Sequence, residues 1–292
     1  MTAALTLAAA AKINLSLHVV GRRNDGYHKL ESLIGFTDVS DVLTLREAAE
    51  IRLTVVGPES GTIECDDRNL VVQAARLVQS HLGVSNGVDM TLEKNIPVAA
   101  GLGGGSADAA ATVSGCLALW STSDDEILSD VKLASALGAD VPICRYGGAA
   151  QVSGIGETIT SAANWPAAWL VLVNPRVPLS TASVFSHFDE PFGSAGRQDF
   201  KGSDYAEFIT FLNGLENNLT AAAIDLAPVI QDALDEIAAL PKCALARMSG
   251  SGPTCFGLFG SPESAQAASQ TLASARPEWW VRPSALQIKS PR

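Results

Sequence analysis

The sequence predicts a protein of the α+β class. Strand-like and helix-like segments follow one another irregularly, without the regular strand–helix–strand order of a doubly wound sheet. A glycine-dense stretch at 147–156 marks a change in composition, and it indicates two domains, which we place at 1–155 and 156–292. A chain of 292 residues, 47% of them hydrophobic, is long enough to build a core in each.

The first predicted strand is the most informative one. Residues 13–19 (INLSLHV) alternate strictly between apolar and polar side chains, which predicts a half-buried strand. The polar face of this strand carries Lys12 and Asn14. The turn signal Asn24-Asp25-Gly26 follows it.

The remaining elements are predicted from periodicity and from stop signals. Further strands are expected at 41–46, 51–56, 91–97 and 169–173, with two more around a glycine turn within 244–259. Helices are expected at 69–82, 106–120, 124–137, 204–213, 218–240 and 262–274.

Composition excludes several classes of protein. The net charge of −11 repels polyanions, so we expect no nucleic-acid partner and no membrane partner. Five cysteines without a CxxC pair indicate reduced thiols rather than a disulfide framework.

No apolar run approaches the roughly 18 to 20 residues that span a bilayer. The segment MTAALTLAAAAK lacks a basic region and is expected to lead into a strand, so we expect a cytoplasmic protein. The oligomeric state is not indicated.

The segment from Pro97 to Ala110 (PVAAGLGGGSADAA) carries the main chemical signal. Its glycines leave backbone amides uncovered by side chains, and an alanine-rich helix follows at once. Loop amides and the positive end of the helix dipole then converge, which is typical of a phosphate site. A flexible linker is the alternative interpretation. No lysine follows Gly105, which excludes a Walker A loop, and Ser106 stands where a dinucleotide-binding fingerprint has its third glycine.

Four segments together resemble the GHMP kinases. PVAAGLGGGSADAA resembles their second motif, PxxxGLGSSAA, and MSGSGPTCFGLF (248–259) resembles their glycine-rich third motif. LGADVPIC (137–144) is similar to a further family segment. AAAKINLSLHVVGRRNDGYHKLES is similar to AKINLxLxVxGxRxDGYHxL, the N-terminal pattern of the diphosphocytidyl-methylerythritol kinases. The matches occur in family order over residues 10 to 259, and GRRNDGYH narrows the resemblance to this branch.

The resemblance implies the two-domain α+β GHMP fold with an active site in the cleft between domains. It implies transfer of the γ-phosphoryl group of ATP to the 2-hydroxyl of 4-diphosphocytidyl-2-C-methylerythritol, in the non-mevalonate route to isoprenoid precursors. The small-molecule partner would therefore carry a cytidine diphosphate group. Two alternatives stay open: a GHMP kinase for another small alcohol, of homoserine or mevalonate type, and a non-catalytic nucleotide-binding homologue. A Rossmann oxidoreductase is disfavoured by the loop sequence.

The resemblance also implies roles for individual residues on the acceptor side. Asp140 would accept the hydroxyl proton, with Lys12 beside it to keep it ionised and to stabilise developing charge. The residues implied in substrate binding are Asn14, Tyr27, His28, Thr181, Phe185, Gly250 and Ser251. Of these, His28 would read the cytosine base, with Tyr27 and Phe185 packing on it. By themselves such residues are also typical of ordinary surface positions, so these roles depend on the resemblance.

On the nucleotide side the resemblance implies one segment and three further residues. The ATP-binding set is Asn69, Leu70, Lys94, Pro97, Val98, Ala99, Ala100, Gly101, Leu102, Gly103, Gly104, Gly105, Ser106 and Ala107. Magnesium is expected because phosphoryl transfer needs it to bridge the β- and γ-phosphates. Ser106 is the candidate that could contribute a hydroxyl, and no carboxylate ligand can be identified. Asp108, expected in the first turn of the helix, complements the helix dipole but lies near the phosphates.

Overall fold

A computed structural model describes residues 4–61, 63–120, 134–162, 165–189, 191–193, 199–202 and 204–287. The chain forms two compact units that interleave in sequence. The first unit comprises Met1–Ala11, Val39–Val98 and Gly103–Tyr146, and the second comprises Lys12–Asp38, Ala99–Leu102 and Gly147–Arg292. Two long strands, β1 (Leu5–Arg22) and β2 (His28–Ala48), contribute residues to both units. The domain boundary at residue 155 stays a prediction.

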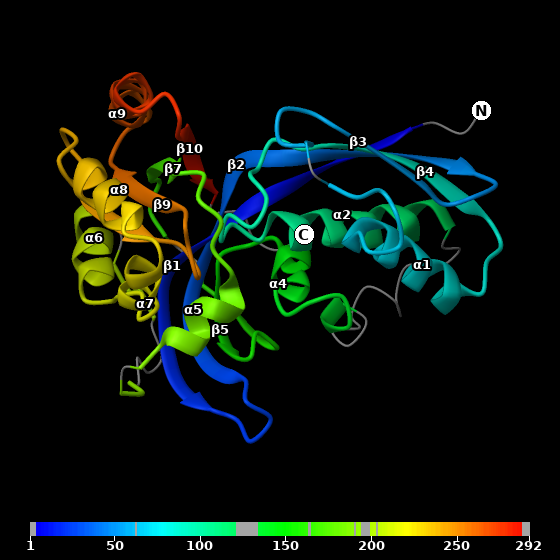
Figure 1. Ribbon diagram of the computed structural model, residues 1–292, viewed down its shortest axis with the longest axis horizontal. Coiled ribbons are helices and arrows are strands. Elements are labelled where there is room, and N and C mark those ends of the chain that lie inside the picture. The colour runs from blue at the N-terminus through cyan, green and yellow to red at the C-terminus, as the bar shows by residue number, and fades with distance from the viewer. Residues whose placement is uncertain are drawn as a thin grey trace. The chain divides into compact units, whose positions relative to one another are not determined.

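The first unit packs helices on a sheet. Strand β4 (Gly87–Glu93) pairs antiparallel with β2 and parallel with β3 (Arg52–Val56). The helices of this unit are α1 (Leu70–Leu82), α2 (Gly104–Trp120) and α4 (Val141–Tyr146). Figure 1 shows α1 and α2 lying along one face of this sheet. Side chains from the strands and from both long helices share one buried hydrophobic core.

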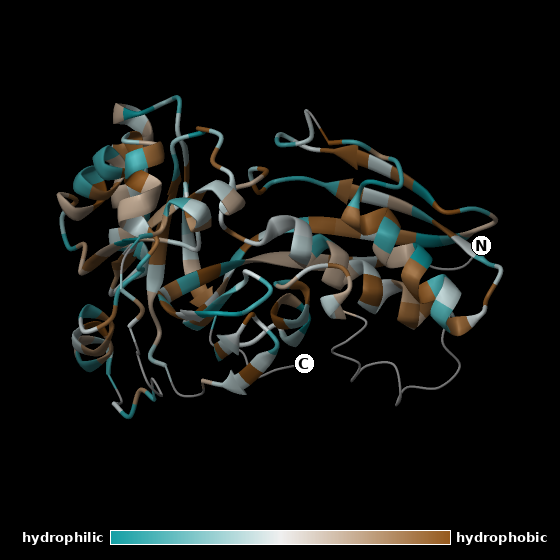
Figure 2. Ribbon diagram, turned by 60° about the horizontal axis from the view of Figure 1, so that its bottom comes forward, coloured by the Kyte–Doolittle hydropathy of each residue, from teal (hydrophilic) through white to brown (hydrophobic). Residues whose placement is uncertain are grey.

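Helix α1 shows how local sequence sets both helix ends. The Asn69 side chain accepts a hydrogen bond from Val71 N–H at the N-terminus. At the C-terminus Gly83 adopts a left-handed conformation, with φ 65°, and its N–H bonds back to the last turn. The predicted helix at 69–82 is therefore confirmed. Figure 2 shows hydrophilic and hydrophobic residues on α1, as expected for a helix with one solvated face.

Helix α2 begins at Gly104, two residues before the predicted start at Ser106. It is buried over most of its circumference, because small alanine side chains let neighbouring elements approach closely. Because the helix starts earlier, Asp108 lies beyond the first turn in which it was expected, and its side chain is buried. That difference matters for the site described below.

The second unit contains the rest of the strands and helices. In its sheet, β10 pairs antiparallel with β2 and β7, and β9 pairs antiparallel with β7 and β8. Strand β5 pairs with β2 and β6. The strands are β5 (Ala150–Gly154), β6 (Thr158–Ser161), β7 (Trp169–Asn174), β8 (Leu245–Met248), β9 (Cys255–Phe259) and β10 (Trp280–Gln287). The helices are α5 (Thr181–His187), α6 (Tyr205–Asn213), α7 (Thr220–Leu226), α8 (Val229–Ala238) and α9 (Pro262–Ala275).

The structure corrects three predicted elements. The predicted helix at 218–240 is two helices, α7 and α8, because Pro228 has no N–H to continue the ladder. The strand predicted at 91–97 is β4, which lies earlier, at Gly87–Glu93. The strand at 13–19 is buried on both faces rather than half-buried, since residues 11–19 are all buried. Most of the helix predicted at 124–137 lies outside the described residues.

The other predicted elements at 41–46, 51–56, 106–120, 169–173, 204–213, 262–274 and within 244–259 are each matched by a strand or helix. Among the described residues no helix is long and apolar enough to cross a membrane.

Candidate active site

The glycine-rich segment leads directly into α2 in the first unit. Gly103 has φ 65°, a left-handed conformation that suits glycine, and its carbonyl accepts the N–H of Ala107 as the helix begins. The amides of Gly104, Gly105 and Ser106 therefore fall in the first turn, where an α-helix has no intrahelical acceptor for them. This is the arrangement that binds phosphate at a helix N-terminus.

The space beside Gly105 is open, whereas Gly104 is packed against neighbouring side chains. A methyl group added at Gly105 would find only Leu70 Cδ1, at 3.8 Å, so there is open space beside this residue. At Gly104 the corresponding group would approach Ile96 Cγ2 to 3.2 Å. Leu70 is the first residue of α1, so the structure brings the predicted nucleotide residues Leu70 and Gly105 together within the first unit.

Lys94 belongs to a buried ion cluster under the start of α2. Its ammonium donates to Asp41 Oδ2 at 2.5 Å and to Asp108 Oδ2 at 2.8 Å, and all three side chains are almost fully buried. Asp41 Oδ1 in turn accepts the backbone N–H groups of Asn95 and Ile96. The ammonium group predicted to bind nucleotide is thus engaged by carboxylates, and a role for Lys94 in ATP binding stays a prediction.

Burial and charge act against each other in this cluster. Burial raises the pKa of Asp108 to about 7, although the charge of Lys94 opposes the shift. Burial alone would lower the pKa of Lys94, but the two carboxylates together raise it. Asp108 Oδ1 has no hydrogen-bond partner among the described residues. The cluster ties the segment after β4 to α2, on either side of the glycine-rich loop in sequence.

Asp140 precedes helix α4 in the first unit and is half-buried. Its carbonyl accepts the N–H of Cys144, the bond that starts the helix. The Cys144 thiol lies 4.0 Å from Gly103 O, so α4 packs close to the start of α2. Asn69, predicted to lie near adenine, caps α1 and also donates to Glu64 O at 2.7 Å.

In the second unit, β1 carries the predicted residues Lys12 and Asn14. Lys12 Nζ donates to Asn14 Oδ1 at 2.7 Å, and Asn14 Nδ2 donates to Ser32 Oγ at 2.8 Å. Both residues are buried, at 5% and 3% exposure, which a solvated lysine on a strand edge would not be. These bonds explain how Lys12 and Asn14 can be buried on the polar face of the strand, since each of the two side chains has a hydrogen-bond partner.

The third glycine-rich segment lies against this strand. Ser249 Oγ accepts the backbone N–H of Asn14 at 3.1 Å and donates to Gly101 O at 3.2 Å. A methyl group at Gly101 would lie 2.6 Å from Gly252 O, so only glycine allows this approach. The Ser251 and Thr181 hydroxyl oxygens are 2.9 Å apart. The structure therefore brings Lys12, Asn14, Thr181, Gly250 and Ser251 together, as a group defined by β1 and this segment.

Two of the predicted base-binding residues, His28 and Phe185, lie in an aromatic cluster. The rings of His28 and Phe185 stack with centroids 5.2 Å apart and an interplanar angle of 22°. Phe188 and Phe192 meet the edge of the same imidazole. Tyr27 is 64% exposed. Burial lowers the pKa of His28, and the charge of Arg22 adds to this effect, which favours a neutral imidazole.

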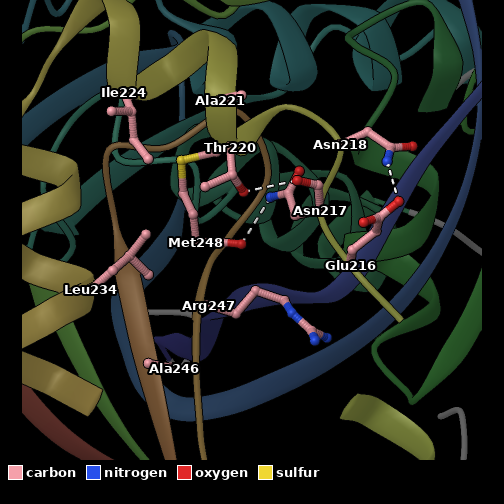
Figure 3. A pocket seen from close by; sticks show the side chains of 10 residues that line it. All are labelled: Glu216, Asn217, Asn218, Thr220, Ala221, Ile224, Leu234, Ala246, Arg247 and Met248. Carbon is pink, nitrogen blue, oxygen red and sulfur yellow. Dashed lines mark hydrogen bonds between the residues drawn. The ribbon is translucent and has the colours of Figure 1, made fainter. Parts of the chain in front are cut away.

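A pocket of about 400 Å³ lies elsewhere in the second unit, among α7, α8, β8 and the segment before α7. Figure 3 shows its lining, which includes none of the predicted site residues. At its wall the Asn217 side chain reaches Met248 O and Gly250 O. The sequence carries no local signal for Asn217, Ser249 and Asp41, because each side chain bonds to a partner far away in the chain.

Comparison with known proteins agrees with the motifs. The models of the GHMP kinases N terminal domain and of the GHMP kinases C terminal match residues 69–148 and 197–277. A 4-diphosphocytidyl-2-C-methyl-D-erythritol kinase from Paramagnetospirillum magneticum is 44% identical over 96% of this chain and 98% of its own. One from Parvibaculum lavamentivorans is 44% identical over 98% of this chain and 99% of its own.

Solved structures give the same picture. A crystal structure of 4-(cytidine 5'-diphospho)-2C-methyl-D-erythritol kinase is 31% identical and has a TM-score of 0.76 over 97% of this chain and 100% of that chain. A homoserine kinase from Cytophaga hutchinsonii, with a TM-score of 0.74 and 19% identity, shows the shared fold alone over 100% of this chain and 98% of that chain. The predicted α+β GHMP fold is confirmed. The chain belongs to the GHMP kinase family.

Proposed function

We propose that the chain is an ATP-dependent kinase of 4-diphosphocytidyl-2-C-methyl-D-erythritol. It transfers the γ-phosphoryl group to the 2-hydroxyl, giving the 2-phosphate and ADP, in the synthesis of isoprenoid precursors. Identity of 44% to kinases of that name, over nearly the full length of both chains, supports this substrate. The structural observation that carries the proposal is the buried Lys12–Asn14 pair held against Ser249.

The residues have distinct roles in this proposal. Asp140 accepts the proton of the attacking hydroxyl, since phosphoryl transfer needs a group that orients or deprotonates the nucleophile. Lys12, held by Asn14 Oδ1 at 2.7 Å, places a fixed positive charge where negative charge develops. Tyr27, His28 and Phe185 bind the cytosine base, and Ser251 and Thr181 present their paired hydroxyls to the acceptor.

ATP is bound at the N-terminus of α2 in this proposal. The first-turn amides of Gly104, Gly105 and Ser106 and the open space at Gly105 fit a phosphate chain. Magnesium fits as an ion held mainly by phosphate oxygens, because Mg²⁺ keeps several waters and needs only one or two protein oxygens. The Ser106 hydroxyl is the proposed protein oxygen. When bound, the ion neutralises charge on the β- and γ-phosphates.

The proposed setting is the cytoplasm. None of the five cysteines, all of which lie in the described part of the chain, forms a disulfide, which suits a reducing compartment. The net charge of −11 favours small-molecule partners over nucleic acid.

The test is a coupled ADP-release assay with ATP and Mg²⁺. It compares 4-diphosphocytidyl-2-C-methyl-D-erythritol with homoserine and mevalonate. Turnover restricted to the cytidyl acceptor is the expected result. Turnover with another alcohol would retain the kinase and reject the substrate, and turnover with none would favour a non-catalytic nucleotide-binding protein.

A further inference from the structure

Asn217 is fixed in place by strand β1. It lies between α6 and α7, and its segment forms a parallel bridge with Leu17. Leu17 N–H donates to Glu216 O, and Asn218 N–H donates to Leu17 O, each at 2.9 Å. The backbone of Asn217 is thus held by the same strand that carries Lys12 and Asn14.

The Asn217 side chain is engaged at both ends within the second unit, through both of its donors and its acceptor oxygen. Its Nδ2 donates to Met248 O and to Gly250 O, both at 2.8 Å, and its Oδ1 accepts Leu219 N–H at 3.0 Å. Figure 3 shows the side chain directed at Met248 from the wall of the pocket. The residue is only 6% exposed. An amide is the side-chain group of this length that supplies two donors and an acceptor, and a carboxylate supplies no donor.

These two bonds orient two peptide units. Because a trans peptide is planar, its C=O and N–H point in opposite directions. The carbonyl of Met248 faces Asn217, and the N–H of the same peptide, that of Ser249, donates to Thr254 O at 2.9 Å. The carbonyl of Gly250 also faces Asn217, so the N–H of Ser251 points away from it. No group in the described part of the chain accepts a hydrogen bond from Ser251 N–H.

The turn needs such a clamp, because its backbone would otherwise have many conformations. Gly250 and Gly252 have φ of 58° and 78°, and glycine loses the most conformational freedom when it is ordered. Within the turn, Gly252 N–H donates to Ser249 O at 2.9 Å. That bond closes the turn but does not fix the orientation of its middle peptide, Gly250–Ser251. A group outside the turn must therefore fix that orientation.

We propose that Asn217 is a positioning residue: it orients the Gly250–Ser251 peptide so that Ser251 N–H donates to an oxygen of the bound acceptor substrate. This inference rests on the proposed kinase function. The amide is pre-oriented before the substrate binds, so its donor stabilises negative charge without reorganisation. Asn217 itself does not touch the substrate.

The test compares Asn217→Asp with Asn218→Asp. The first change keeps the shape and removes both donors. The second is the same chemical change one residue on. Asn218 Oδ1 accepts Val19 N–H and can still do so as a carboxylate, and the donor that is lost makes an exposed bond to Glu216 Oε1 rather than a bond to the turn. We expect Asn217→Asp to lower kcat/KM for the cytidyl acceptor about tenfold or more, with the KM for ATP within about twofold of wild type. Asn218→Asp is expected to stay near wild type. If Asn217→Asp does not fold, Asn217→Ser replaces it, because serine keeps a neutral polar group. This variant is also expected to lower kcat/KM for the cytidyl acceptor while the KM for ATP stays near wild type.

Amide hydrogen exchange of the peptide that covers 248–254 gives a readout independent of activity. In the Asn217 variants exchange is expected to rise in this peptide and to stay unchanged in β7 and α9. Equal loss for both substrates, an exchange increase throughout the unit, or behaviour like that of Asn218→Asp would each overturn the proposal. If the wild-type chain does not turn over the cytidyl acceptor, the proposed function fails, and the exchange data still decide whether Asn217 orients the turn.

Discussion

The ammonium group of Lys94 donates a 2.8 Å hydrogen bond to the carboxylate of Asp108, and the two side chains are each 4% exposed. Lys94 follows β4, and Asp108 lies in α2, so this pair joins the two segments that flank the glycine-rich loop in sequence. Asp41 completes the cluster from β2. These ion pairs fix the position at which the glycine-rich loop ends and α2 begins.

Replacing Lys94 by Met should destabilise the chain by about 3–5 kcal/mol, because it leaves the Asp41 and Asp108 carboxylates buried without a cation. Urea unfolding followed by circular dichroism measures this. Arg68→Met, which breaks a solvent-exposed ion pair with Asp66, is the control and should cost no more than about 1 kcal/mol. If Lys94→Met lowers the free energy of unfolding by no more than the control does, the cluster does not anchor α2.

Gly105→Ala should separate nucleotide binding from stability. The added methyl group meets nothing closer than Leu70 Cδ1, at 3.8 Å, so stability should be unchanged or rise by up to about 1 kcal/mol. If the phosphate chain occupies this space, the methyl group should push it away from one of the first-turn amides. The loss of that hydrogen bond to a charged group should raise the KM for ATP about tenfold. Gly61→Ala, in an exposed turn with nothing within 4 Å, is the control. An unchanged KM for ATP would remove Gly105 from the phosphate site.

Asp140→Asn should lower kcat by about 10²- to 10⁴-fold while ATP still binds, because an amide cannot accept the hydroxyl proton. Steady-state turnover together with titration of a fluorescent ATP analogue measures the two effects separately. Asp89→Asn, an exposed residue of β4, serves as the control for loss of one negative charge. Near-normal turnover of Asp140→Asn would exclude it as the proton acceptor.

Tyr27→Ala should raise the KM for the cytidyl acceptor about 5- to 150-fold, the energy of stacking one base on an aromatic ring. The side chain is 64% exposed, so its removal should leave the melting temperature nearly unchanged. Tyr27→Phe keeps the ring and should retain most of the affinity. An equal rise in KM for the acceptor and for ATP would argue against a role at the cytosine base.

The free energy of unfolding should decrease as the pH is lowered, because protonation of the buried His18 favours the unfolded chain. Burial is the largest cause that lowers the pKa of His18; among the nearby charges, Arg247 lowers it and Glu216 and Glu31 oppose the shift. Its Nε2 has no hydrogen-bond partner among the described residues. Since the unfolded chain then binds a proton more readily than the folded chain, stability is full above the ordinary pKa of about 6.5 and is lost as the pH falls below it.

The measurement is the melting temperature between about pH 7.5 and 5. His18→Gln should have a flatter profile than wild type over this window, whereas His187→Gln, at an exposed histidine, should reproduce the wild-type slope. A slope unchanged by His18→Gln would show that other groups control acid stability.

The elements that could be predicted from the sequence are those specified by neighbouring residues. Helix α1 has its cap at Asn69 and its stop at Gly83 within its own segment, and α9 begins at a Ser261 cap followed by Pro262. The glycine-rich loop and the GRRNDGYH segment likewise carry their information locally. Such local signals indicate the fold class, the family and the proposed reaction without reference to any tertiary contact.

Only the tertiary structure decided which polar groups are buried and what holds them. Asn14 meets Ser249 across 235 positions of sequence, and Lys94 meets Asp41 across 53. Asn217 reaches Gly250 across 33 positions. A side chain's environment depends on such distant partners, and local periodicity contains no information about them. The sequence therefore determined the elements and the reactive residue types, whereas long-range packing decided that Lys12 is buried and that Lys94 is an anchor of α2.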